Sequence, residues 1–146
     1  LLNNIAFVFA ENGEVGEAER HLQAISAVIH ESPYTVATSG LVHFKKGHFQ
    51  RASLLYEEAL RLCLRAEDKI RIRQKWNLEL GKAAIELEPK KAVRYLTKAK
   101  NESDGEEGIA RQAASILKAL SLGATQLPKH IVLPSLQISK DKPEES

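Results

Sequence analysis

The stretch GLVHFKKGHFQRASLLYEEAL, residues 40–60, places two glycines, a small residue, an aromatic residue and a second small residue at helical intervals. These residues are Gly40, Gly47, Ala52, Tyr56 and Ala59. The last three follow one another at steps of four and three residues, so they share one face of a helix. Gly47 precedes that helix and predicts the end of an earlier one, because glycine readily adopts the left-handed conformation that ends helices. The stretch therefore predicts two antiparallel helices joined by a short turn.

The same order of small and apolar residues occurs 34 residues earlier in the chain. The matched pairs are Gly40 with Ala6, Gly47 with Gly13, Phe49 with Val15, Ala52 with Ala18, Tyr56 with Leu22, and Ala59 with Ile25. A period of about 34 residues is typical of helix-turn-helix units that stack on copies of themselves. We therefore expect two successive helix pairs, at about 1–32 and 33–66, with small residues where the paired helices approach each other.

A third, irregular helix pair is expected at about 68–101. Ala92, Leu96 and Ala99 repeat the small-large-small pattern, and Pro89 suits the first turn of their helix. The pattern comes 40 residues after its counterpart in the second pair, so about six residues are added. These added residues lengthen either the first helix of the pair or the connection between its two helices.

The rest of the chain is expected to hold one more helix and a tail. Ser103 is interpreted as the N-cap of a helix at about 105–122, with Glu106 as its capping-box partner and Gly123 as its stop signal. A terminal repeat needs a cover with a polar outer face, so this helix is interpreted as a capping helix. The alternative is the first helix of a fourth repeat. Residues 128–146 are predicted to be an extended or disordered tail.

The repeated pattern resembles the tetratricopeptide repeat, a family characterised by small and bulky residues at set positions in each helix pair. The first pair offers Leu2, Ile5, Ala6, Phe9, Ala18 and Leu22, and the second offers Gly40, Ala52, Tyr56 and Ala59. Ser39 and His43 depart from the Leu and Tyr of the family pattern. The resemblance implies an all-α fold over residues 1–127, a right-handed superhelix of stacked antiparallel helix pairs with a C-terminal capping helix. A generic antiparallel helical bundle is the alternative.

The resemblance also implies a concave groove, lined by the first helix of each pair, that binds an extended or helical peptide. The matching positions are Asn3, Phe7, Ala10, Glu11, Tyr34, Ala37, Leu41, Phe44, Lys45, Gln74 and Asn77. Phe7, Leu41 and Phe44 are expected to form its apolar floor, because the family's internal packing does not need them. The cations with which chaperone-binding members clamp a terminal carboxylate are absent from the matching places. We therefore expect a scaffold, adaptor or regulator that binds a protein segment, unless the tail or an upstream helix fills the groove.

Charge is unevenly distributed, although the formal net charge of the chain is only +2. Residues 1–60 carry −3, residues 61–100 carry +7 and residues 101–146 carry −2. The basic middle is either an ordinary solvated surface or a patch that binds nucleic acid or an acidic ligand. The patch would comprise Arg65, Lys69, Arg73, Lys90, Arg94 and Lys98. Few aromatic residues lie among these charges, so base stacking has little support.

Patterns that indicate catalysis or metal binding are hard to find. The five histidines lack metal-ligand spacing, and Cys63 has no clear histidine partner. We therefore expect no enzymatic activity, no cofactor and no bound metal. A single cysteine and the lack of an apolar run of about 18 residues favour a cytoplasmic protein without a membrane span. The chain contains no methionine and begins at Leu1, which indicates a piece of a longer protein; self-association is left open.

Overall fold

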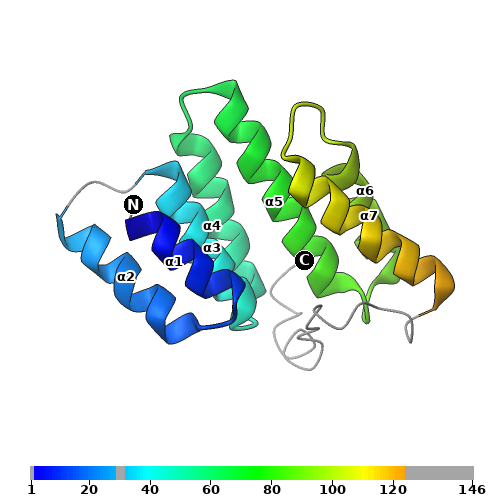
Figure 1. Cartoon of the computed structure of the whole chain (residues 1–146), viewed down its shortest axis with the longest axis horizontal. Coiled ribbons are helices and arrows are strands. Elements are labelled where there is room, and N and C mark those ends of the chain that lie inside the picture. The colour runs from blue at the N-terminus through cyan, green and yellow to red at the C-terminus, as the bar shows by residue number, and fades with distance from the viewer. Residues whose placement is uncertain (1, 29–31, 124–146) are drawn as a thin grey trace. The chain divides into compact units, whose positions relative to one another are not determined.

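The computed structural model describes residues 2–28 and 32–123, apart from the side chains of residues 2, 3 and 26–28. Within these residues it contains seven α-helices and no β-strand (Figure 1). The helices are α1 (Leu2–Glu11), α2 (Val15–Val28), α3 (Pro33–Lys45), α4 (Phe49–Leu62), α5 (Ala66–Ala84), α6 (Pro89–Asn101) and α7 (Glu107–Leu122). The predicted all-α fold class is therefore confirmed for the described part of the chain. The tail predicted for residues 128–146 lies outside it.

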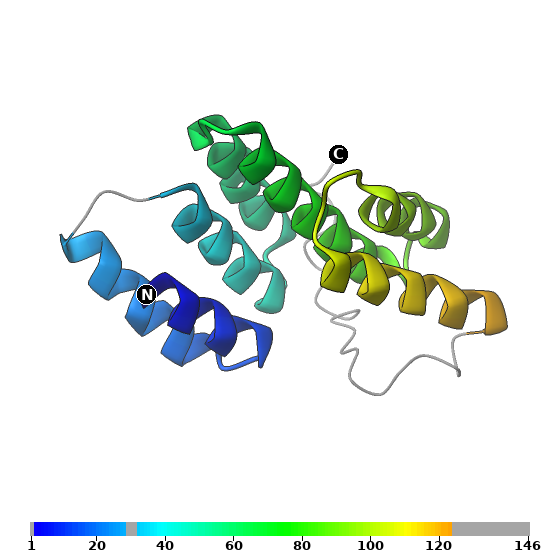
Figure 2. The same cartoon turned by 45° about the horizontal axis from the view of Figure 1, so that its top comes forward.

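The described residues form two compact units, one up to Leu64 and the other from Arg65 onward. In the first unit, α1 pairs with α2 and α3 pairs with α4, and α3 also packs against both helices of the preceding pair (Figure 1). In the second unit, α5 pairs with α6, and α7 packs against both of them (Figure 2). Each unit thus contains a helix pair whose two members both contact the next helix in the chain.

The buried faces of the helix pairs consist mainly of alanine and larger aliphatic residues. In the first unit, the core of the first pair and its contact with α3 comprise Ala6, Ala10, Ala18, Leu22, Ile25, Leu41 and Val42. The buried residues of α4 are Phe49, Ala52, Tyr56 and Ala59. The core of the second unit comprises Leu78, Ile85, Ala92, Leu96, Ala99, Ala113 and Ile116. The small and apolar residues predicted to share one face of α2, α4 and α6 are therefore buried.

None of the helices in the described ranges is long and apolar enough to cross a membrane.

The α1–α2 and α3–α4 turns have the same backbone structure, 34 residues apart. Gly13 and Gly47 both have a φ of 82°, as expected for a glycine in the left-handed conformation that ends a helix. The residue after each glycine donates its N–H to a carbonyl at 2.8 Å: Glu14 to Phe9, and His48 to His43. The 34-residue period of the sequence is therefore a structural repeat at these turns.

Two glycines lie where the second helix of a pair presses against the first. A β-carbon on Gly40 of α3 would lie 2.8 Å from Tyr56 Cδ2 and 3.2 Å from the Ala52 carbonyl oxygen. A β-carbon on Gly81 of α5 would lie 2.5 Å from Leu96 Cγ. Carbon atoms in ordinary contact are about 3.5–4.0 Å apart, so both positions require glycine. The close approach expected at Gly40 is confirmed, and Gly81 with Leu96 is its counterpart in the third pair.

The residues added in the third pair lie in its first helix. α5 contains 19 residues, whereas α3 contains 13. The connections within the two pairs, 46–48 and 85–88, are both short. Of the two alternatives left open by the sequence, a longer first helix is therefore the one observed.

The start of α7 differs from the prediction. The helix begins at Glu107, and the residue before it, Glu106, makes no side-chain capping hydrogen bond. Ser103 lies in the preceding turn, where Asp104 has a φ of 63°, so the predicted N-cap at Ser103 is wrong. The predicted stop is confirmed, because Gly123 directly follows the helix with a φ of 105°.

Gly81→Ala is expected to destabilise the second unit, because the new methyl group would overlap the Leu96 side chain. Overpacking of this kind costs about 1–3 kcal/mol, which exceeds the gain of ~1 kcal/mol in helix propensity. Gly108→Ala in α7 is the control, since a β-carbon there meets no neighbouring atom within 4 Å. Urea unfolding followed by circular dichroism measures both variants, and equal midpoints would contradict the close contact.

Candidate functional site

Four of the residues predicted to line a groove are partly exposed on α1 and α3, the first helices of the two pairs in the first unit. Phe7 is 37% exposed, whereas Glu11, Tyr34 and Lys45 are half-buried. We call these four residues the α1–α3 face. Asn3 was predicted to belong to the same surface, but its side chain lies outside the described ones.

Other residues predicted to line the groove are buried in the first unit: Ala10, Ala37, Leu41 and Phe44. Leu41 is fully buried because α1 packs onto α3 and encloses it. Phe44 is only 3% exposed, and its ring centroid lies 5.9 Å from that of Phe49 and 5.8 Å from that of Tyr56. The expectation that Leu41 and Phe44 are not needed for internal packing is therefore corrected, because both belong to the core.

Gln74 of α5 was also expected in the groove, but it is fully buried. Its side-chain nitrogen donates to the carbonyls of Ala99 at 3.0 Å and Glu106 at 3.1 Å, and its oxygen accepts the Glu106 N–H at 2.7 Å. A β-carbon on Gly105 would lie 2.7 Å from the amide carbon of Gln74. Gln74 therefore joins α5 to the segment between α6 and α7, and its role is structural. Asn77, the other groove residue predicted on α5, is half-buried.

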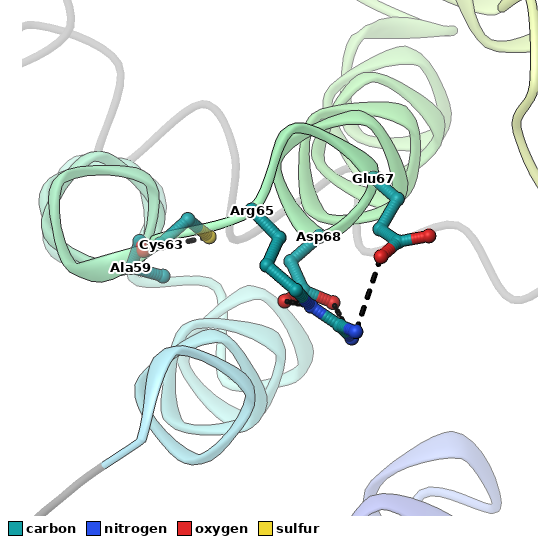
Figure 3. Close-up of polar contacts among 5 residues, drawn as sticks. All are labelled: Ala59, Cys63, Arg65, Glu67 and Asp68. Carbon is teal, nitrogen blue, oxygen red and sulfur yellow. Dashed lines mark hydrogen bonds and ion pairs between the residues drawn. The ribbon is translucent and has the colours of Figure 1, made fainter.

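Two of the six residues of the predicted basic patch have carboxylate partners. Arg65 lies 3.0 Å from Asp68 and 3.1 Å from Glu67 (Figure 3). Arg73 donates two hydrogen bonds to Glu102, at 3.1 and 3.0 Å, and these bonds raise the pKa of Arg73 above its usual value. The positive charges of both arginines are therefore offset locally.

The other four residues of the predicted patch, Lys69, Lys90, Arg94 and Lys98, have exposed side chains. Lys69 lies on α5, whereas the other three lie on α6 at intervals of four residues. Three of these four exposed cations therefore lie on α6.

A buried ionic cluster on α5 was not predicted. The buried carboxylate of Glu79 lies 3.0 Å from the Lys75 ammonium and 3.2 Å from that of Lys82. The three residues follow at steps of four and three, so they lie on one face of the helix. Removing one partner of a buried ion pair costs about 3–5 kcal/mol, because it leaves an uncompensated charge. The charges of Lys75 and Lys82 are therefore neutralised within the second unit and add little to its exposed charge.

His43 and His48 face each other across the α3–α4 turn, with their Nδ1 atoms 3.3 Å apart. A hydrogen bond between them requires at least one neutral ring. Burial, followed by the positive charges of Lys46 and Arg51, lowers the pKa of His43, which favours its neutral form. Within residues 2–28 and 32–123, no group of three or more His, Cys, Asp or Glu side chains is placed to hold a metal ion.

Cys63 follows the last residue of α4 and is buried. Its Sγ donates a hydrogen bond to the carbonyl of Ala59 at 3.3 Å (Figure 3). Reactive cysteines lie in partly exposed, electropositive surroundings that stabilise the thiolate. The position of Cys63 therefore suits helix packing better than nucleophilic chemistry.

Comparison with known proteins identifies no relative of the chain. No family model matches the chain, and the searches of curated proteins and of solved structures likewise find no match. The function is therefore argued from the α1–α3 face and from the charge of α6.

Phe44→Ala is expected to destabilise the first unit by about 3–5 kcal/mol, the usual cost of removing a buried phenylalanine side chain. Phe7→Ala is the matched control, because Phe7 is 37% exposed and should cost much less. Urea unfolding followed by far-UV circular dichroism measures the free energy of unfolding of both variants. Equal losses would show that Phe44 is not a core residue.

Gln74→Met is expected to destabilise the second unit, since methionine fills the space but leaves the polar groups of Ala99 and Glu106 unpaired. Each buried polar group left without a hydrogen bond costs about 1–3 kcal/mol. The amide proton of Glu106 should also exchange faster with solvent. Gln112→Met, at a half-buried position of α7, is the control, and equal stability of the two variants would contradict the role of Gln74.

Proposed function

We propose that this chain is a protein-interaction module whose α1–α3 face binds a peptide or protein segment. In this role it serves as a scaffold, adaptor or regulator. The proposal includes the finer architecture that the tetratricopeptide resemblance implies, a right-handed superhelix of helix pairs with α7 as its cap, and a cytoplasmic location.

The observation that carries the proposal is the partial exposure of Phe7 on a helix of which another face is buried in the core. Ala6 and Ala10, on the same helix, are fully buried, so α1 is fixed against its neighbours. Phe7 nevertheless keeps 37% of its surface exposed. Aromatic side chains on rigid elements are enriched at the centres of protein interfaces, because they bury a large area at low entropic cost.

The other residues of the α1–α3 face supply polar contacts around Phe7. Glu11 and Lys45 occupy equivalent places 34 residues apart and carry opposite charges. Such charges orient a partner and exclude wrong ones more than they add affinity. Tyr34 adds a second, half-buried aromatic ring to this face, and aromatic residues are enriched at protein interfaces.

The repeated packing of the helices also supports the proposal. In the first unit α3 contacts both helices of the pair before it, and in the second unit α7 does the same. Within the first unit, contact between α1 and α3 brings the first helices of its two pairs together, and a surface of this kind can be followed by one extended or helical segment. We expect micromolar affinity, about −8 kcal/mol.

The test is to select peptides from a random display library on the immobilised 146-residue chain and to measure their affinities by fluorescence anisotropy. Phe7→Ala should weaken binding about tenfold or more, which corresponds to about 1.4 kcal/mol. Leu54→Ala is the control, because Leu54 is 56% exposed on α4, the second helix of its pair, and should have no effect. Failure to select any peptide, or equal weakening by both variants, would contradict the proposal.

A further inference from the structure

The charge composition of α6 differs from that of every other part of the described chain. Its 13 residues include five cations and no acidic residue. The cations are Lys90, Lys91, Arg94, Lys98 and Lys100, and all five are exposed. Lys91 alone among them forms an ion pair in the described part of the chain, with Glu88 at 2.8 Å. The other four positive charges of the helix face solvent.

Three of these cations form a line on the solvent side of the helix. Lys90, Arg94 and Lys98 follow one another at intervals of four residues, which corresponds to steps of about 6 Å along the helix axis. Ala92, Leu96 and Ala99 are buried on the opposite side. We call Lys90, Arg94 and Lys98 the α6 basic stripe.

The surroundings of the stripe leave its charge uncompensated. Elsewhere in the basic middle, Arg65, Arg73 and the two lysines beside Glu79 are held by carboxylates. The exposed Lys69 and Arg71 lie on α5. Like charges four residues apart on a helix repel one another. An anion with regularly spaced charges would relieve this repulsion along the whole stripe.

We propose that the α6 basic stripe binds the phosphate backbone of a nucleic acid without reading its sequence. Thr97 and Asn101 are exposed beside the stripe and can add neutral hydrogen bonds to phosphate oxygens, as such side chains commonly do. Tyr95, the aromatic residue of α6, is half-buried and presents little of its ring for base stacking, so the proposed contact is to the backbone.

Two other anionic partners fit the stripe less well. A protein partner would need an apolar or aromatic anchor at the centre of its contact. The exposed Val93 and the half-buried Tyr95 lie beside the stripe, but its centre consists of cations. A helix that binds a membrane surface inserts its apolar face among the lipids, but the apolar face of α6 is buried against its own unit. The phosphate backbone needs neither feature, because release of counterions drives its binding.

The experiment measures binding of the full chain to fluorescein-labelled oligonucleotides of mixed sequence, as a single strand and as a duplex, at several salt concentrations. The test variant is Lys90→Gln/Arg94→Gln/Lys98→Gln. The control variant, Arg51→Gln/Lys69→Gln/Lys118→Gln, removes the same charge from exposed positions on α4, α5 and α7. Glutamine keeps the helix propensity in both.

We expect the test variant to lose about tenfold or more in affinity and to lower the log–log salt slope by about two to three, at roughly 0.7–0.9 per phosphate contact. The control variant should bind almost as the unmodified chain does.

Equal losses of affinity in the two triple variants, or a flat response to salt, would overturn the proposal. Displacement of the oligonucleotide by polyglutamate of equal charge, as readily as by unlabelled nucleic acid, would assign the stripe to acidic polypeptides and also overturn it. None of these outcomes depends on peptide binding at the α1–α3 face.

Discussion

The fold depends on the close contact between the two helices of each pair. In the α3–α4 pair Gly40 leaves space for the ring of Tyr56, and in the α5–α6 pair Gly81 leaves space for Leu96. Both large side chains are almost completely buried, so each fills the space that a β-carbon on the facing helix would occupy. A small residue opposite a large one fixes the register of the pair. Once the register of the α5–α6 pair is fixed, the side of α6 that faces solvent is fixed too, and with it the α6 basic stripe.

The sequence predicts this part of the fold well, because the contacts within a pair repeat with the chain. The buried stripes of α2, α4 and α6 and the left-handed glycines at 13 and 47 follow directly from residue spacing. Spacing did not determine where the added residues of the third pair lie. A longer helix and a longer connection move Ala92 by the same amount, and only the structure, with its 19-residue α5, distinguishes them.

The candidate site was harder to predict, because the first helix of a pair is covered on two sides. The residue pattern of one helix pair shows which side of each helix faces the other helix of that pair. It does not show which residues a neighbouring pair buries. Leu41 is buried because the preceding pair packs onto α3. Phe44 is buried against Phe49 and Tyr56 of its own pair. Polar residues raise a similar difficulty, since Gln74 finds its hydrogen-bond partners 25 and 32 residues away. Likewise, Arg73 finds Glu102 at a separation of 29 residues. That pairing separates Arg73 from the exposed cations of the α6 basic stripe.

The central claim is that glycine-mediated contacts set the register of the helix pairs, and solution NMR of the full chain tests it most directly. The measurement is of nuclear Overhauser effects from the Hα protons of Gly40 to the ring of Tyr56, and from those of Gly81 to the methyl groups of Leu96. A β-carbon at these glycines would lie 2.8 Å and 2.5 Å from the partner side chains, so the account predicts strong signals for both pairs. The absence of both signals, with chemical shifts that still report the helices, would show that the pairs have another register.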